Sequence, residues 1–469
     1  MDFPTGLTTK ELKRRGRQIP LNCVDKCLLA LDGINEPVTT YAILDLEGTI
    51  DPIRLNQAIL SAQRAHPRMR TLLRRKRLRL FREVKEDLRG GVLAVQDLAS
   101  LQGATYERCL FEFLNRRIDI RKELPFRVLL LRKNEGECSL IFTFHHSAVD
   151  GLRALLFVRR IIESYNDEVS KDSQSSEDAR IYSKKDELLE YANSQRSRVK
   201  HYYVKMFSYL FHRFVIDAFP LPTRVFHDRS GGSKDIDHYA RNIDPTELEL
   251  IGSKAASAAV ELNDILLAAC FRVVEKWNSM HGKASNRIRI MAPVNLSPKG
   301  FRNVVSNQAS WLSLSTRPED RADPAKLLRK VRADTVNAAL NRRAFSLVYF
   351  FYFCSRFPLM VVRGMCRFLM ITRTYVDTIL ITNLGLTWSK VGSDEPAVTN
   401  IGDSRIVNIT GSTAVVTPMG FSICIGIYNK NLSISVAYRP ALFSRGKMQE
   451  FLHLYAEEIK NYQVGPQGS

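Results

Sequence analysis

The segment His145–Gly151 (HHSAVDG) combines the residue types that proton-transfer chemistry needs. Imidazole titrates near neutral pH, so a histidine here can take a proton from a hydroxyl or amine that attacks a carbonyl carbon. Asp150 can hold the loop in place through a cationic partner, and Gly151 allows backbone conformations that other residues resist. The chain has only nine histidines, so the adjacent pair His145-His146 favours a catalytic interpretation.

Two other kinds of site compete with that interpretation. The segment can instead be a loop with two core or metal-binding histidines, but metal binding needs further Cys, His or carboxylate ligands at suitable spacing, and none accompanies the pair. A Ser-His-Asp hydrolase usually carries a G-x-S-x-G nucleophile elbow, which the sequence lacks. We therefore predict a general base and no metal.

Two strands and a helix must position this loop. FRVLLLR (Phe126–Arg132) and CSLIFTF (Cys138–Phe144) read as strands joined by the turn Asn-Glu-Gly, and the second strand runs straight into HHSAVDG. Leu152–Tyr165 has a helical pattern of apolar residues. Successive side chains of an extended segment point to opposite sides. One histidine should therefore line a cleft and the other should pack inside a lobe.

The polar segment Asn166–Glu187 is the best linker in the chain and predicts a boundary between two halves. Helices and strands are interspersed in both halves, so we predict an α/β (α+β) fold of two similar lobes. We expect a basic N-terminal arm at 1–20, an N-terminal lobe at 21–175, a C-terminal lobe at 176–462 and a tail at 463–469.

Further elements follow from hydrophobic periodicity and turn signals. The expected helices are Asp25–Asp32, the segment DPIRLNQAILSAQRAHP, MFSYLFHRFVIDAF, ELNDILLAACFRVVEKW, Pro324–Leu340 and Gly446–Asn461. The expected strands are Tyr41–Gly48, Arg70–Val84, RIRIMAPVNL, TILITNLG, AVVTP, FSICIGIYNKN and LSISVAYRP.

The charge balance is unusual, with 69 Lys and Arg against 49 Asp and Glu, a net charge of +20. Such a surplus concentrates anions at the surface. The dispersed basic residues, without zinc-finger spacing or an aromatic RNA-binding motif, argue against a nucleic-acid partner. The eight cysteines show no C-x-x-C spacing and read as reduced thiols. The N-terminal residues lack the apolar core of a secretory signal, which predicts a cytoplasmic protein.

Two segments bear on anionic partners. Arg74, Arg75, Lys76, Arg77 and Arg79 form the densest basic run, which is either a charged exposed edge or an anion-attracting patch. Arg356, Arg363 and Arg367 recur at helical spacing within an apolar stretch, which is either a core helix broken at Pro358 or a helix that lies on the inner face of the membrane. No uninterrupted apolar run is long enough to span a bilayer.

HHSAVDG matches the HHxxxDG signature of the condensation-domain superfamily, which resembles chloramphenicol acetyltransferase in fold. The resemblance extends over roughly Asp25 to Lys460. Within the superfamily, the sequence most resembles stand-alone condensation-like enzymes and wax ester synthase/diacylglycerol acyltransferases. The supporting segments, in chain order, are LEGTIDPIRLNQAILSAQRAHPRMR, ELPFRVLLLR, LNDILLAA, RIRIMAPVNL, ITNLG and LSISVAYRP.

By that resemblance, two chloramphenicol acetyltransferase-like lobes form a pseudo-dimer with a tunnel between them, and His146 is the base. His145 and Gly151 support the motif. Asp150 points away from the substrate and pairs with a cation, for which Arg287, Arg289 and Lys299 are the candidates. Asn383 and Gly385 fall on a segment that crosses between the lobes, so they are candidates to line the tunnel.

The sequence departs from the patterns of the superfamily at two places. Relatives often carry Arg directly after the PVNL-like strand, where this chain has Ser297-Pro298-Lys299, which leaves the partner of Asp150 open. The DFGWG motif of the plant enzymes is absent, which counts against that branch. Asn263-Asp264 resembles an element of the wax ester synthase branch, but it is equally a helix cap.

The resemblance implies an acyltransferase that moves an acyl group from a thioester to a hydroxyl or amine acceptor, in lipid or natural-product biosynthesis. The donor is coenzyme A or an acidic carrier protein with a phosphopantetheine arm, and no cofactor is bound permanently. The alternative is a catalytically silent condensation-like domain that recruits a carrier protein. We expect a monomer.

Overall fold

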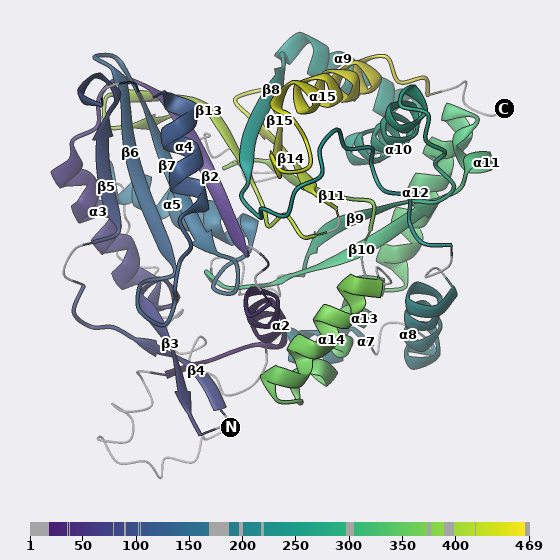
Figure 1. Cartoon of the computed structure of the whole chain (residues 1–469), viewed down its shortest axis with the longest axis horizontal. Helices are drawn as coiled ribbons and strands as arrows, with labels where there is room; N and C mark the ends of the chain where they lie inside the picture. The colour runs from purple at the N-terminus through teal and green to yellow at the C-terminus, as the bar shows by residue number, and fades with distance from the viewer. Residues whose placement is uncertain are drawn as a thin grey trace.

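The computed structural model describes residues 18–464 except 35, 37, 78, 89–90, 102, 104, 168–186, 197–199, 217–219, 297–303, 373–376, 389–397 and 418. Two six-stranded sheets stand side by side in Figure 1, each with its own helices and hydrophobic core. A three-stranded sheet and a group of helices lie below them in that view. This arrangement confirms the expected α/β fold of two lobes.

The N-terminal lobe has the strand order β12-β13-β2-β7-β6-β5. Its alternating apolar residues bury one face against α3 and α5, which pack on each other, while α4 lies on the other face. The elements are β2 (Thr39–Glu47), α3 (Pro52–Ala65), β5 (Leu93–Asp97), α4 (Tyr106–Asn115), β6 (Phe126–Asn134), β7 (Glu137–His145), α5 (Gly151–Tyr165), β12 (Asn400–Ile401) and β13 (Ser404–Ser412), with short helices η1 (Pro67–Arg70) and η2 (Leu98–Ser100).

The C-terminal lobe has the strand order β10-β9-β11-β14-β15-β8. Helices α10 and α15 pack together over this sheet, with Trp277 and Tyr455 completely buried between them. The elements are β8 (Asp237–Ile243), α9 (Pro245–Ser257), α10 (Leu262–Met280), β9 (Ile288–Asn295), β10 (Ala309–Thr316), α11 (Pro318–Arg321), α12 (Pro324–Leu340), β11 (Ile379–Leu386), β14 (Phe421–Tyr428), β15 (Asn431–Tyr438) and α15 (Arg445–Lys460).

The two lobes exchange a segment. After β11 the chain crosses to the N-terminal lobe, where the buried Trp388 donates a hydrogen bond from Nε1 to the carbonyl of Leu155 on α5. Strand β13 then pairs with β2 before the chain returns to the C-terminal sheet. The expected strand AVVTP is wrong: the strand lies earlier, at Ser404–Ser412, and Ala414–Thr417 forms none. The 176–462 segment therefore contributes to both sheets.

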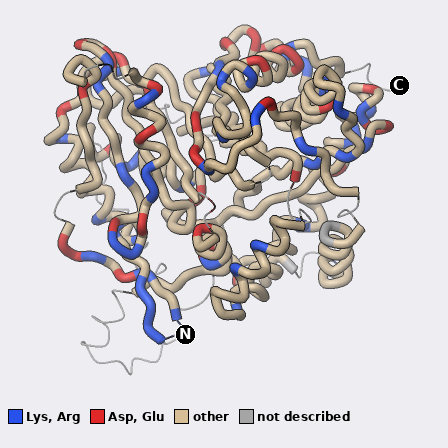
Figure 2. Tube along the Cα trace, viewed as in Figure 1, with Lys and Arg blue, Asp and Glu red and all other residues tan. Residues whose placement is uncertain are grey.

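A third group of elements lies beneath the junction of the lobes. It comprises β1 (Gln18–Pro20), α2 (Cys23–Asp32), the hairpin β3 (Thr71–Lys76) and β4 (Arg79–Val84), α7 (Glu187–Arg196), α8 (Tyr202–Phe211) with η4 (His212–Ile216), α13 (Arg343–Ser355) and α14 (Leu359–Thr372). Figure 2 shows the Lys and Arg residues of the hairpin projecting at the lower edge of the view. The single strand expected over Arg70–Val84 is thus two strands.

Most of the expected boundary at Asn166–Glu187 falls outside the described residues. Helix α5 ends at Tyr165, and the next described helix, α7, begins at Glu187. Among the residues that the structure describes, no helix is both long and apolar enough to cross a membrane.

Candidate active site

His146 lies directly after β7, where the chain leaves the sheet and begins the loop before α5. Its backbone N–H donates to the carbonyl of Val38, which extends the pairing of β7 with the chain beside β2. The ring Nδ1 lies 3.1 Å from the carbonyl oxygen of Val149. A carbonyl only accepts, so this contact assigns the proton of the neutral ring to Nδ1. The lone pair is then on Nε2, the atom that a general base needs.

His145 is placed differently, although it is the neighbouring residue. Its side chain is buried, and Nδ1 accepts hydrogen bonds from the hydroxyl and the backbone N–H of Ser147, at 2.8 and 3.3 Å. Nε2 faces the carboxylate of Asp32 at 3.8 Å, which is too long for a hydrogen bond. Burial lowers the pKa of His145, although Asp32 opposes this shift. His145 packs inside the lobe while His146 is partly exposed, as expected of successive residues at a strand end.

The carboxylate of Asp150 is tied to two backbone groups. Oδ1 accepts from the N–H of Arg153 at 3.0 Å, which makes Asp150 the N-cap of α5, and Oδ2 accepts from the N–H of Gln308 at 2.8 Å. These bonds satisfy a helix terminus and join the two lobes. Asp150 is buried within this frame.

The candidate cationic partners of Asp150 lie elsewhere. The side chain of Arg289, one of the three candidates, pairs instead with Asp377 at 2.8 Å, and both are buried. Arg287 precedes β9, and among the described residues no ion pair joins it to Asp150. Lys299 lies outside the described residues. Backbone N–H groups bind the carboxylate of Asp150 in place of a cation. One of them belongs to the N-terminus of α5, where a helix offers unpaired donors to a carboxylate.

The segment Val304–Gln308, which leads into β10, clamps the motif loop from the other lobe. Asn307 donates from Nδ2 to the carbonyl of His146 and to Asp25 Oδ1, both at 2.8 Å. Its own carbonyl accepts from Asn22 at the start of α2. The sequence analysis missed this segment, because an apolar and amide stretch before a strand carries no chemical signature of its own.

A buried ionic network lies beneath the loop. Asp25 accepts a hydrogen bond from Arg68 and lies 3.9 Å from Arg82. Arg82 donates to the carbonyl and to the hydroxyl of Ser147, between the two histidines and Asp150. Burial lowers the pKa of Arg82 to about 10, and Asp25 opposes the shift. These three charged residues were also missed, since they come from three separate segments and no spacing links them.

The crossing segment lies beside the motif through Leu384, and the assignment of Asn383 and Gly385 to a tunnel stays a prediction. Asn383 donates to Asn263 Oδ1 at 2.9 Å and accepts from the N–H of Gly385 at 2.8 Å. Gly385 has a φ of +64°, a conformation that glycine adopts without strain. A methyl group added at Gly151 would contact the side chain of Leu384 at 3.7 Å. Gly151 and Leu384 also line a cavity of about 30 Å³ between the lobes.

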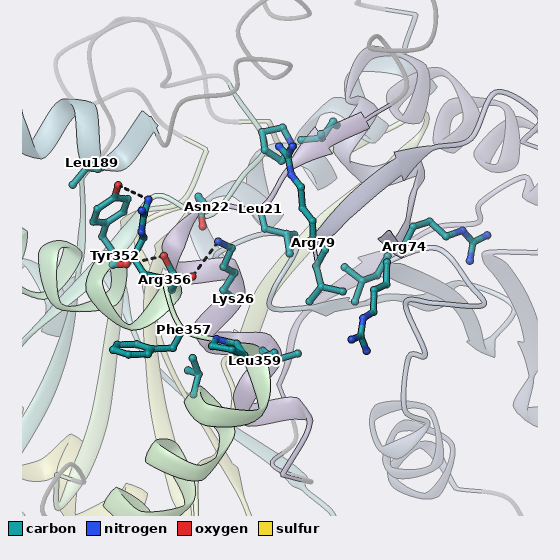
Figure 3. Close-up of a pocket in the computed structure, with 18 of the residues that line it drawn as sticks. Leu21, Asn22, Lys26, Arg74, Arg79, Leu189, Tyr352, Arg356, Phe357 and Leu359 are labelled. Carbon is teal, nitrogen blue, oxygen red and sulfur yellow. Dashed lines mark hydrogen bonds between the residues drawn. The ribbon is translucent and has the colours of Figure 1, made fainter. Parts of the chain in front are cut away.

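A much larger cavity, of about 1160 Å³, opens below the loop between the β3–β4 hairpin, α2 and the helices α13 and α14 (Figure 3). Asn22 and Ser306 line it. Asn22 donates to the carbonyl of Asn307, which in turn donates to the carbonyl of His146. The cavity wall is therefore two hydrogen bonds from the backbone of the candidate base.

Comparisons with known proteins agree with this geometry. The family model of the condensation domain matches residues 31–343. An uncharacterized protein of Mycobacterium tuberculosis (strain H37Rv), Rv2305, is 26% identical over 353 residues, 72% of this chain and 77% of that protein. The probable non-canonical nonribosomal peptide synthetase CymA of Salinispora arenicola is 27% identical over 169 residues, 34% of this chain and 2% of that protein.

Two solved structures share the fold over almost the whole chain. The first condensation domain of the calcium-dependent antibiotic synthetase, in complex with a substrate analogue, has a TM-score of 0.69 at 13% identity and covers 96% of this chain and 97% of that one. The epimerization domain from the third module of tyrocidine synthetase B has a TM-score of 0.63 at 14% identity, covering 95% and 96%. At these identities the likeness concerns the fold.

Proposed function

Since the chain belongs to the condensation-domain family, we propose that it is an acyltransferase in which His146 is the general base. The observation that carries this proposal is the bond from His146 Nδ1 to the carbonyl of Val149, which directs the basic lone pair to Nε2. Two further contacts, from Val38 and Asn307, hold the backbone of His146. A base that is fixed in position and in tautomer loses little freedom when a substrate arrives.

The reaction we propose joins a thioester to a hydroxyl or amine. The acceptor oxygen or nitrogen attacks the thioester carbonyl while His146 Nε2 takes its proton. The carbon–sulfur bond then breaks, and the thiolate leaves with that proton as a free thiol. The products are an ester or amide and the thiol of the donor, so no covalent enzyme intermediate, oxidant or metal is required.

For the donor we propose a phosphopantetheine-linked acyl group, on coenzyme A or on a carrier protein. Both donors are anionic, which suits a chain with a net charge of +20. We also propose that this chain carries out chemistry of the wax ester synthase type, in which the acceptor is a hydroxyl.

We further propose that the chain contacts anionic membranes peripherally through α14. Met360, Phe368 and Ile371 are 80%, 64% and 71% exposed, which is unusual for large apolar side chains on one helix. The basic stripe expected along Arg356, Arg363 and Arg367 does not form: Arg356 caps α13, and the Arg363 guanidinium turns towards Gly33 on the α2 side. The exposed stripe of α14 is thus mainly apolar, with Arg367 beside it.

Co-sedimentation with phosphatidylcholine vesicles, with and without phosphatidylglycerol, tests the membrane contact. Phe368→Glu with Ile371→Glu should reduce the vesicle-bound fraction, whereas Ile53→Glu, at a position 72% exposed on α3, should leave it unchanged. Equal binding of both variants would refute a contact through α14.

The experiment for the proposed function is a thiol-release assay with a panel of acyl-coenzyme A and acyl-carrier donors, each with alcohol and amine acceptors. We expect thiol release that depends on the acceptor and yields an acylated product by mass spectrometry. Carrier binding without turnover, across the panel, would instead support a silent domain. Donor-dependent epimerization without transfer would also overturn the proposal.

A further inference from the structure

The large cavity below the motif loop has a strongly basic lining. Eight of its lining residues carry positive charge, and Glu190 is the one acid among them. The basic residues are Lys26, Arg68, Arg74, Arg75, Arg79, Arg121, Arg356 and Arg363. Its volume, about 1160 Å³, is slightly above the range of ordinary ligand pockets, roughly 300–1,000 Å³. A cavity of this size and charge is suited to an anionic ligand.

Several of these cations have weak partners or none. Lys26 donates to the carbonyl of Ser355 at 3.3 Å, and Arg356 reaches the hydroxyl of Tyr352 at 3.5 Å (Figure 3). Two of the lining cations pair with carboxylates: Arg68 with the buried Asp25, and Arg74 with Glu83 at 2.9 Å. Neutral oxygens at such distances compensate little of a cation's charge.

Arg363 is the most informative of the group. It comes from α14 and crosses the cavity wall towards the end of α2, where its guanidinium occupies the space that a side chain at Gly33 would need. Its Nε is buried and, like the Nε of Arg68 in the same lining, makes no hydrogen bond within the described part of the chain. A buried donor without an acceptor is costly, so such a group usually has a ligand or water as its partner.

The rest of the lining is apolar. Leu73 and Leu80 of the hairpin and Leu359 and Val362 of α14 belong to it, and Leu80 and Leu359 pack against the hydrophobic cluster that contains Leu73. Met360, which is 80% exposed, also belongs to the lining and connects the cavity to the apolar outer face of α14. The cavity therefore has a basic region and an apolar region, and both continue to the surface. A purely polar anion or a neutral apolar molecule would match only one of the two regions.

We propose that this cavity binds an amphiphile with an anionic head, a phosphate or carboxylate, and an apolar chain. Its place beside Asn22 and Ser306, next to the clamp on His146, favours this amphiphile as the acyl acceptor through a hydroxyl or amine that it also carries, a role that rests on the proposed function above. The head lies among Lys26, Arg79 and Arg363, and the chain follows the leucines towards α14. The head group can come from a membrane lipid or from a free amphiphilic acid.

Binding is tested by calorimetry on the full-length His146→Ala protein, which separates binding from turnover. The probes are dihexanoyl phosphatidic acid, dihexanoyl phosphatidylcholine and inorganic phosphate. We expect phosphatidic acid to bind at least about tenfold more tightly than the other two, as the loss of one charge-assisted hydrogen bond or of the apolar contact implies. Equal affinity for phosphatidylcholine, or for phosphate alone, would overturn the proposal.

Variants locate the site. Arg363→Gln should weaken phosphatidic acid binding about tenfold or more, whereas Arg108→Gln, on the exposed surface of α4, should not change it. Arg79→Gln serves as a second variant, since Arg79 is exposed on the hairpin and its replacement should not disturb folding. Unchanged binding in both cavity variants contradicts the assignment. Intact binding in a wild-type chain that transfers no acyl group would count against the proposed function alone.

Discussion

The motif loop and the basic cavity lie side by side, but they differ in the partners of their polar groups. Around the loop, His145, Asp150 and Asn307 each have at least two hydrogen bonds, several of which join the lobes. In the cavity, Lys26 and Arg356 contact neutral oxygens at 3.3 and 3.5 Å. A region whose polar groups are bonded to both lobes holds a geometry, whereas cations with weak neutral partners are suited to receive an anionic ligand. Under the proposed function, proton transfer and ligand recognition would be divided between these two regions.

The largest effect should come from His146, the general base of the proposed mechanism. His146→Ala should lower kcat by about 10²–10⁴-fold, the range of general-base assistance, with little change in donor binding. Single-turnover kinetics with the best donor of the panel would measure this. His145→Gln is the matched control and should act mainly through stability, because His145 is buried against Ser147. Near-full turnover in His146→Ala would remove His146 from the mechanism.

The ionic network beneath the loop should show the next effect, on stability. Asp25→Ala leaves the buried guanidinium groups of Arg68 and Arg82 without their carboxylate, at a cost of about 3–5 kcal/mol in the free energy of unfolding. Glu112→Ala, which breaks an exposed pair with Arg108, should cost about 0–1 kcal/mol. Chemical denaturation measures both. Equal losses would mean that the network does not hold the loop.

Replacing Asp150 should lower the free energy of unfolding by less than replacing Asp25. Asp150→Ala removes the N-cap of α5 and leaves the N–H of Gln308 unpaired, so we expect a loss of about 2–3 kcal/mol. Asp244 caps α9 and accepts the N–H of Glu247, a single bond among the described residues, so Asp244→Ala should lose about 1 kcal/mol. If Asp150→Ala unfolds like the wild type yet loses all turnover, Asp150 acts directly on the substrate.

The sequence predicted the fold and the motif because both depend on local patterns. The strand β7 and the helices α5 and α12 follow from periodicity and caps, and Pro324–Leu340 was predicted with the observed bounds. The contacts of Asn307 and Arg82 were not predicted, since each joins residues that are 65 to 285 positions apart. Strand β13 was missed for a similar reason: it belongs to the sheet of the other lobe.

The smallest expected effect concerns the charge of the cavity side of the molecule. Raising the ionic strength from 0.1 M to 1 M shortens the Debye length from about 10 Å to about 3 Å. The KM of an anionic donor should therefore rise with salt while kcat changes little, and the rise should be steeper for a carrier protein than for coenzyme A. Initial rates at several salt concentrations measure this. A KM that does not respond to salt would contradict electrostatic capture of the donor.

The pH dependence of acyl transfer, measured in wild type and in His146→Ala, tests the role of His146 most directly. A base must be unprotonated to accept a proton, so the wild-type kcat should rise with pH through a single ionisation and then level off. In His146→Ala the remaining rate should lack that ionisation, while the donor still binds. The same ionisation persisting in the variant would contradict the assignment, because the titrating base would then be another group.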